Sequence, residues 1–295
     1  METIERLEDQ LDSLGELKTI VRTMKALSAA SIREYERAVE ALAGYAQTVE
    51  RGFRVVLADL PAGAGPIPPG DDASPAGAIV FGSDHGLCGR FNETVAAHAA
   101  EAFAAAGGAP PRVLAVGERA AASLEHAGCR VSDRVLLPGS AAHITVLTRK
   151  LLVRVQQWQD QHGIASVRLY YNRHSGGRGY EPVEAALLPV DLARLRDDGG
   201  WPSRGLPTYS MDPWRLLRHL IHQYLFITLF RGCAESQASE HASRLAAMQS
   251  AEGNLEERLE AVTMTFRRAR QNAITSELLD VVSGFEAITS GRGQR

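Results

Sequence analysis

The sequence predicts an α/β domain inserted between two very long terminal helices that form an antiparallel coiled coil. Three observations lead to this fold class. Apolar residues recur at alternating steps of three and four in residues 1–60, and the same pattern returns in residues 212–289. This spacing is typical of a coiled-coil seam. Between the two segments, residues 77–190 alternate short β-type runs with helical stretches, which indicates a separate α/β domain.

Residues 1–60 are predicted to form one N-terminal coiled-coil helix with a narrow apolar seam. No proline precedes Pro61, and the seam begins at Ile4, Leu7 and Leu11. At 1.5 Å per residue, a helix of this size spans roughly 85 Å. Residues 61–76 are rich in proline, glycine and alanine and have no periodicity, so we expect a linker there.

The central segment is predicted to build a mostly parallel sheet with helices on its faces. Strands are expected at 76–83, 111–117, 130–138, 166–173 and 180–189, and helices at 93–106, 118–128 and 141–162. Alternating strands and helices favour parallel pairing through crossover connections. The last two strands are separated only by a Gly-rich turn, which predicts an antiparallel hairpin at one edge of the sheet.

The C-terminal coiled-coil helix is expected over residues 212–289, after a second linker at 191–211 and before a tail at 290–295. Asp212 followed by Pro213 is a typical helix start, because aspartate caps the first turn and proline tolerates the first helical position. Neither terminal helix can bury its seam alone, so we expect the two to pair. The C-terminal helix is the longer one, which leaves one end of the rod as a single helix.

Composition excludes several classes of protein. The chain has 295 residues, of which 45% are hydrophobic, and a net charge of −3. This charge gives no global electrostatic reason to expect a nucleic-acid partner. Cys88, Cys129 and Cys233 are odd in number and far apart, which argues against a disulfide scaffold and a C-x-x-C metal site. The apolar run YLFITLF at 224–230 is too short for a membrane span, which needs about 20 residues.

The segment GSDHGLCGRFNET, residues 82–94, places a serine, an aspartate, a histidine and a cysteine together and raises the question of an active site. A catalytic triad needs side chains that converge in space, usually from distant positions. The segment also lacks the G-x-x-x-x-G-K-[ST] phosphate loop and the G-x-G-x-x-G dinucleotide motif. We therefore expect a structural turn, with no catalytic, metal-binding or cofactor-binding residue. The glycines let the backbone bend and Asn92 N-caps the next helix; the turn residues are Gly82, Asp84, Gly86, Cys88, Gly89 and Asn92.

Two clusters on the C-terminal helix each have more than one interpretation. His219 and His222 lie three apart and could bind a metal, but exposed polar positions explain them equally well. Arg267, Arg268 and Arg270 crowd one turn. They could form a solvated face, pair with the glutamates of 256–260, or contact carboxylates on another protein, for which the planar guanidinium group is well suited.

Several segments resemble the gamma subunit of the rotary F-type ATP synthase. The most specific are ASEHASRLAAMQSAEGN at 238–254 and RRARQNAITSELLDVVSG at 267–284. GSDHGLCGRFN at 82–92 is also similar to the family pattern, and IVRTMKALSAAS at 20–31 follows it more loosely. Arg90 stands where the family has the second glycine of an LCGG element, which indicates a divergent branch. The resemblance covers nearly the whole chain.

The resemblance implies a Rossmann-like domain on a coiled-coil central stalk, or rotor shaft. It implies four kinds of partner: the alpha and beta subunits of the catalytic ring, epsilon, and the membrane c ring. Ion flow through the c ring would drive ATP synthesis or hydrolysis on beta, while this chain would be non-catalytic. It would be a peripheral membrane protein on the cytoplasmic side of a bacterial plasma membrane, or on the equivalent side of another energy-transducing membrane. The residues implied in partner contact or torque coupling are Met24, Arg244, Arg270, Gln271, Thr275 and Glu277.

Two other classes of protein would also fit the layout. One is a non-enzymatic coiled-coil scaffold or tether that carries an inert α/β domain. The other is a nucleotide-binding enzyme with helical arms, which predicts nucleotide binding by the isolated 77–190 domain. The scaffold predicts a chain without an ATPase partner.

Overall fold

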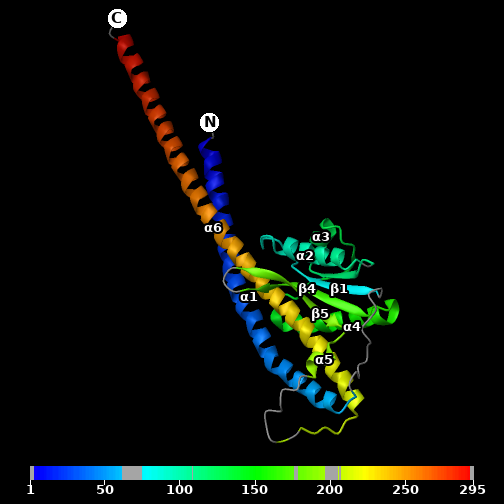
Figure 1. Cartoon of the computed structure of the whole chain (residues 1–295). Helices are drawn as coiled ribbons and strands as arrows, with labels where there is room; N and C mark the ends of the chain where they lie inside the picture. Colours follow the sequence, from blue (N-terminus) through cyan, green and yellow to red (C-terminus); the bar gives the residue numbers. More distant parts are fainter. Residues whose placement is uncertain are drawn as a thin grey trace. The chain divides into compact units, whose positions relative to one another are not determined.

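The computed structural model describes residues 3–61, 75–107, 109–175, 179–196, 205 and 207–292, and side chains up to residue 283. The chain forms two compact units. Unit 1 comprises residues 1–27 and 247–295, and unit 2 comprises residues 28–246. Two long helices, α1 (Ile4–Ala58) and α6 (Pro213–Arg292), contribute to both units (Figure 1). Most of the segment expected as the first linker, 62–74, lies outside the described residues.

The ends of the long helices have identifiable partners. The side chain of Arg196 donates hydrogen bonds to the carbonyl oxygens of Leu57 and Leu60, each at 2.9 Å, and so places a cation at the C-terminus of α1. Asp212 accepts a 2.9 Å hydrogen bond from the backbone N–H of Arg215, as expected of an N-cap. Helix α6 continues to Arg292, into the segment expected as a tail.

Unit 2 contains a five-stranded mixed sheet. The strands are β1 (Ala76–Phe81), β2 (Arg112–Val116), β3 (Val131–Val135), β4 (Ser166–His174) and β5 (Tyr180–Leu188). Their order is β3-β2-β1-β4-β5. β1 is parallel to β2 and β4, β2 is parallel to β3, and β5 is the antiparallel edge strand beside β4. The predicted parallel sheet with one antiparallel hairpin is therefore confirmed.

Helices cover both faces of this sheet. α2 (Phe91–Ala105) and α3 (Glu118–His126) lie on one face, and α4 (Ile144–His162), preceded by the short helix η1 (Ala141–His143), lies on the other (Figure 1). The unit 2 part of α6 packs into the same apolar cluster as α4. Strand β1 is buried on both faces: Ile79 and Phe81 join the α4–α6 cluster, whereas Ala78 and Val80 join the α2–α3 cluster. This is why its sequence is a continuous apolar run rather than an alternating one.

The two long helices pack against each other within each unit. In unit 2 the last turns of α1 and the first turns of α6 share an apolar cluster that contains Phe53, Val56 and Leu217. In unit 1, Glu252 on α6 accepts hydrogen bonds from Arg22 and Lys25 on α1, and Lys18 pairs with Glu256 at 2.8 Å. Earlier residues of α1 therefore meet later residues of α6, which is the antiparallel pairing that the sequence predicted. Among the described helices, none is both long and apolar enough to cross a membrane.

The expected N-cap role of Asn92 is wrong. Helix α2 begins at Phe91, so Asn92 already lies in its first turn. The N-cap position is occupied by Arg90, whose side chain makes no capping hydrogen bond. The chain enters the helix earlier than the local pattern suggested because the Asn92 amide is used in a tertiary contact with the end of β1.

Gly117, which follows β2, cannot be replaced without strain. Its φ is 112°. A Cβ atom on Gly117 would lie 2.6 to 2.9 Å from the backbone of Ser83. We predict that Gly117→Ala lowers the free energy of unfolding by about 1–3 kcal/mol, because alanine disfavours this conformation and the contact is with main chain. Urea denaturation measures this. Gly139→Ala is the matched control, since a Cβ atom there meets nothing within 4 Å; an equal loss in both variants would contradict the prediction.

Candidate functional site

The candidate site is the contact between the β1–α2 turn, residues 82–92, and residues 237–244 of α6. We call it the turn–helix junction. It lies wholly within unit 2. Strand β1 ends at Phe81 and helix α2 begins at Phe91. The segment between them must therefore reverse the direction of the chain within a few residues. Two of the segments that resemble one family therefore meet in space at this junction.

Ser83 and Asn92 close the turn by a reciprocal pair of hydrogen bonds. The backbone N–H of Ser83 donates to Asn92 Oδ1 at 2.9 Å, and Asn92 Nδ2 donates to Ser83 Oγ at 2.8 Å. Ser83 Oγ donates in turn to the carbonyl oxygen of His85 at 2.7 Å. Both Ser83 and Asn92 are buried. Their polar atoms therefore form hydrogen bonds that stabilise the turn.

The glycines of the turn serve different purposes. Leu87 and Gly89 adopt left-handed conformations, with φ of 63° and 60°, whereas Gly82 and Gly86 do not. Gly82 is needed for close packing, because a Cβ atom there would lie 2.5 Å from the Cβ of Ala120. Leu87 adopts a conformation that is unfavourable for leucine. It is also 61% exposed, so burial of its side chain does not offset this cost. The turn is thus held in place by its surroundings rather than by glycine alone.

Asp84, the acid of the apparent triad, binds backbone N–H groups outside the turn. Asp84 Oδ1 accepts a 3.1 Å hydrogen bond from the backbone N–H of Glu118, at the start of α3, and Oδ2 accepts one of 2.9 Å from the N–H of Leu137. Asp84 therefore acts on a helix N-terminus, where a carboxylate is favourable. Cys88 is buried, and burial raises the pKa of its thiol. A protonated thiol is a poor nucleophile, so this arrangement does not activate an attacking group.

Helix α6 contributes a buried ion pair to the turn–helix junction. Arg244 donates from Nη2 to Glu240 Oε1 at 2.6 Å, and Gln237 Nε2 donates to Glu240 Oε2 at 2.8 Å. The Glu240 and Arg244 side chains are only 6% and 9% exposed. Ser243 Oγ donates to the carbonyl oxygen of Cys88 at 2.6 Å, which ties α6 directly to the turn. Arg244 also reaches the turn carbonyls of 85 and 86 through longer contacts of 3.5 and 3.4 Å.

Burial dominates the electrostatics of the junction. It raises the pKa of Glu240, although Arg244 and Gln237 act in the opposite direction. Burial also lowers the pKa of His241 to about 4, and the positive charge of Arg244 adds to this shift. The neutral His241 ring stacks on Tyr35 of α1, with ring centroids 5.6 Å apart and planes 16° from parallel. The turn–helix junction therefore contains one balanced ion pair, Glu240 with Arg244, and a neutral histidine, so it buries no unpaired charge at the contact of α6 with the turn and α1.

The residues expected in torque coupling are not all brought together. Arg244 belongs to the buried junction in unit 2, whereas the other five lie in unit 1. Met24 is half-buried and lies next to Lys25, which bonds Glu252. The remaining four follow Glu252 by 18 positions or more, or about 27 Å along the helix. All four are exposed; they are Arg270, Gln271, Thr275 and Glu277.

The arginine and histidine clusters also have definite surroundings. Arg267, Arg268 and Arg270 are exposed and, within the described part of the chain, form no ion pair, so the alternative in which they pair with the 256–260 glutamates is not observed. His219 and His222 are exposed. The described residues contain no group of three His, Cys, Asp or Glu side chains placed to hold a metal ion.

Sequence reasoning missed Gln237, Glu240 and Ser243. The available signal was the spacing of Glu240 and Arg244, which are four apart and therefore neighbours on one helix face. The stretch around them, SQASEHASR, is rich in small residues, which is typical of a helix closely packed on its neighbours. Together these features would have indicated a buried pair rather than an exposed contact.

We predict that His241 makes stability fall in acid. Its folded pKa of about 4 lies below the ordinary value of 6.5, so its contribution is present above pH 6.5 and is lost as the pH falls towards 4. Protonation then favours the unfolded chain by about 2 kcal/mol at pH 4.5. His241→Gln should lose this part of the acid sensitivity, as measured by denaturation at pH 7 and pH 4.5. The exposed His222→Gln should keep it, and identical pH slopes for the two variants would refute the assignment.

A double-mutant cycle tests the buried ion pair. Arg244→Met leaves the Glu240 carboxylate buried without its cation, which should cost about 3–5 kcal/mol of unfolding free energy. Adding Glu240→Met removes the unpaired charge, so the double variant should be more stable than Arg244→Met alone. Chemical denaturation of the three variants measures the coupling. Strictly additive losses would mean that the two side chains act independently.

Comparison with known proteins gives a consistent result. The ATP synthase family model matches residues 3–288. The chain is 27% identical over 282 residues to the ATP synthase gamma chain of Moorella thermoacetica, covering 96% of this chain and 98% of that relative. It is 29% identical over 309 residues to the ATP synthase gamma chain of Granulibacter bethesdensis, covering 98% and 100%.

The fold has solved counterparts as well. A chain in the cryo-EM structure of the Euglena gracilis mitochondrial ATP synthase matches with a TM-score of 0.68 at 17% identity, covering 98% of this chain and 95% of that one. At this identity the match shows the fold. Because the family match and the alignments with the named gamma chains both run through nearly the whole sequence, this chain belongs to the gamma-chain family of ATP synthases.

Proposed function

We propose that this chain is the rotor shaft of an F-type ATP synthase, which couples ion flow through a membrane c ring to ATP synthesis or hydrolysis on the beta subunits. In this role it is not itself catalytic. It contacts the alpha and beta subunits, epsilon and the c ring, and stays on the cytoplasmic side of a bacterial plasma membrane or the equivalent side of another energy-transducing membrane. The neighbour in the Euglena structure belongs to an assembly described as OSCP/F1/c-ring.

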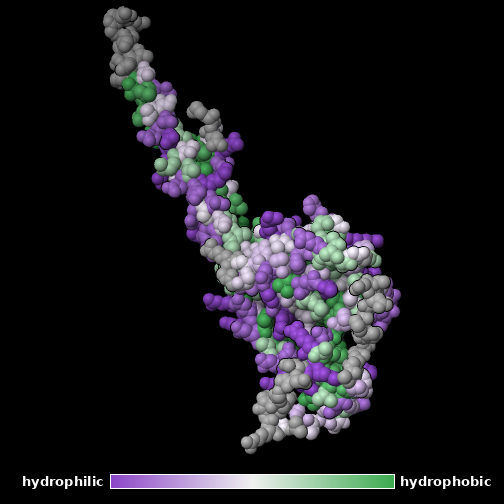
Figure 2. Space-filling view, in the orientation of Figure 1, coloured by the Kyte–Doolittle hydropathy of each residue, from purple (hydrophilic) through white to green (hydrophobic). Residues whose placement is uncertain are grey.

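The observation that carries this proposal is the exposed surface of α6 in unit 1. The first described residues of α1 share a groove with α6 residues between Thr265 and Ser276. Four large apolar side chains that follow this groove are 53% to 70% exposed; they are Leu278, Leu279, Val281 and Val282. Figure 2 shows green hydrophobic patches among purple hydrophilic ones along this part of α6. Exposed apolar surface of this kind indicates a protein partner.

The charged residues beside this surface suit a sliding contact. Arg267, Arg268 and Arg270 are exposed, and their guanidinium groups can pair with carboxylates on beta in a two-point fashion. A single exposed ion pair contributes only about 0–1 kcal/mol. Such contacts guide a rotating helix without fixing it in one position. Arg270, Gln271, Thr275 and Glu277 are therefore proposed as contact residues.

The first experiment is recovery of the tagged chain from membranes, followed by identification of the co-purified subunits. We expect alpha, beta, epsilon and c subunits. A scaffold or tether would instead bring down proteins other than the catalytic ring. Recovery of intact chain without alpha and beta would overturn the proposal.

Met24→Lys tests coupling. Glu252 already binds Arg22 and Lys25, which flank Met24 in the sequence. Because that carboxylate is occupied, we expect the added ammonium group to bind a carboxylate on beta instead. Such a bond, worth about 1.5–3 kcal/mol in one rotary position, would deepen one stop of the cycle. Ions pumped per ATP hydrolysed, measured with the assembled complex in vesicles, should fall more than hydrolysis does.

Thr23→Lys is the control for Met24→Lys, because it adds the same charge at an exposed neighbouring position. We expect it to leave coupling close to the wild-type value. A second change at Arg270 or Glu277 should combine additively with Met24→Lys if the two levels of the coil act separately. Unchanged coupling in a normally assembled Met24→Lys complex would mark Met24 as an ordinary seam residue.

A further inference from the structure

Three serines of helix α6 are buried in unit 2, and they differ in what their hydroxyl groups bind. Ser236 and Ser239 are fully buried, and Ser243 is 9% exposed. The hydroxyl group of Ser236 has no hydrogen-bond partner among the described residues, and that of Ser239 donates to the carbonyl oxygen of Glu235 in the same helix. Ser243 instead donates to the carbonyl oxygen of Cys88 in the β1–α2 turn, at 2.6 Å. This bond connects α6 to another element.

The apolar contacts of this part of α6 are made by small groups. Cys233, Ala234 and Ala238 join the cluster formed with the sheet and α4, and a Cβ atom on Gly232 would lie 3.5 Å from the ring of Phe81. Apolar burial is non-directional, and small side chains offer few protrusions that could interlock. These contacts therefore keep α6 against the sheet, but they oppose rotation of the helix about its own axis only weakly.

The acceptor of the Ser243 bond is held in place by the rest of the turn. The reciprocal bonds between Ser83 and Asn92 close the turn around Cys88. On the other side of Cys88, a Cβ atom on Gly89 would lie 3.7 Å from Ser243 Oγ, so the serine also lies against the backbone that follows the acceptor. The hydroxyl group of Ser243 is therefore fixed against a turn that does not depend on α6 for its own shape.

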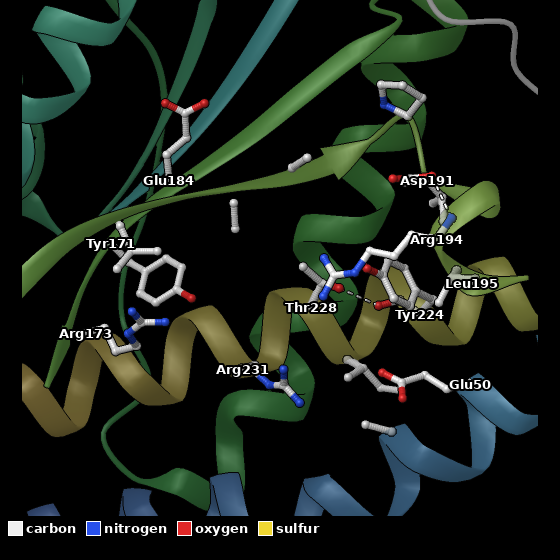
Figure 3. A pocket seen from close by; sticks show the side chains of 17 residues that line it. Glu50, Tyr171, Arg173, Glu184, Asp191, Arg194, Leu195, Tyr224, Thr228 and Arg231 are labelled. Atoms are coloured by element: carbon white, nitrogen blue, oxygen red, sulfur yellow. Dashed lines mark hydrogen bonds between the residues drawn. The ribbon is translucent and has the colours of Figure 1, made fainter. Parts of the chain in front are cut away.

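Among the described residues, two other polar contacts join α6 to the α/β domain. Arg244 reaches turn carbonyl oxygens at 3.4 and 3.5 Å, distances at which a hydrogen bond is weak. Tyr171 of β4 points towards α6 in Figure 3 and shares a hydrogen bond with Glu235. Ser243 lies closer than Glu235 to Ala247, where α6 enters unit 1. A twist applied to α6 from unit 1 therefore reaches the Ser243 bond before it reaches the Tyr171 contact.

We propose that Ser243 is a positioning residue through which torque passes between α6 and the α/β domain, because its hydroxyl group fixes the rotational position of the helix on the Cys88 carbonyl oxygen. This inference rests on the rotor function proposed above. A hydrogen bond depends steeply on distance and angle, so it breaks when α6 turns about its axis, whereas the apolar contacts change gradually. Without the bond, the helix slips under load, and ATP is hydrolysed while fewer ions are moved.

The experiment compares Ser243→Ala with Ser236→Ala in the assembled complex in vesicles. The two positions are seven residues apart and therefore lie on the same face of α6, about two turns from each other. Both substitutions remove one buried hydroxyl group, but only that of Ser243 binds the turn. ATP hydrolysis is measured with an ionophore present, so that no gradient opposes rotation. The ion gradient and the ATP hydrolysis that continues at its maximum are then measured in sealed vesicles.

We expect Ser243→Ala to hydrolyse ATP at close to the wild-type rate when no gradient opposes rotation. In sealed vesicles it should build a smaller gradient, and hydrolysis at the maximal gradient should rise about fivefold, the factor that corresponds to one neutral hydrogen bond. Ser236→Ala and Ser239→Ala should behave like the wild-type complex. Ser243→Thr, which keeps the hydroxyl group, should restore most of the gradient.

Subunit composition and the thermal midpoint establish that each variant is assembled and folded. Equal gradients in normally assembled Ser243→Ala and Ser236→Ala complexes would overturn the inference. A Ser243→Ala defect that is as large without a gradient as under load would also overturn it, since a general structural defect does not depend on load. Failure of the proposed rotor function is a different outcome, in which the wild-type complex does not form or moves no ions.

Discussion

The structure depends on one constraint, which is that helix α6 must bury its apolar side chains against different neighbours along its length. An isolated helix cannot bury a seam, and most helical stability comes from packing. Between 233 and 244, α6 lies against the sheet and α1, and most of its side chains are buried. Small residues such as Ala234 and Ala238 permit this close approach. From 249 to 283 in unit 1, α6 residues are instead exposed or half-buried, because α1 covers only one stripe. Exposure along the helix therefore follows the number of its neighbours.

Close packing around α6 makes its polar groups costly unless they are bonded internally. Burying a charge is unfavourable, and an ion pair offsets the cost only when the remaining atoms are also satisfied. Glu240 meets this condition through Arg244 and Gln237. The same geometry fixes the axial position of the helix, since the 2.6 Å bond from Ser243 to the Cys88 carbonyl is lost if α6 slides by one turn. Among the described residues, Ser236 Oγ is buried without a hydrogen-bond partner. The junction thus specifies register more than it adds stability.

These contacts also explain which features the sequence could predict. The parallel sheet, the edge hairpin, both long helices and the Asp212 cap follow from local pattern, because periodicity and capping involve residues close together in the chain. The start of α2 and the use of Asn92 were mispredicted because the partner of Asn92 is Ser83, nine positions earlier at the other end of the turn. Asp84 caps a helix 34 positions later, and Glu240 is buried where α6 packs on the β1–α2 turn. Such roles depend on tertiary proximity, for which a single sequence carries little signal.

The two units use charge in opposite ways, and this difference is suited to a rotating shaft. In unit 2 the Glu240–Arg244 pair is buried, so breaking it leaves an uncompensated charge and is strongly unfavourable. In unit 1 the pairs of Arg22 and Lys18 with glutamates on α6 involve partly exposed side chains, and pairs of that kind contribute about 0–1 kcal/mol each. A shaft needs one part in which its helices keep a single register under load. It also needs a part whose surface binds each of the surrounding subunits only weakly as the shaft turns. The contacts of Ser243 and Arg244 with the β1–α2 turn supply the first property, whereas exposed charge and a single apolar stripe supply the second.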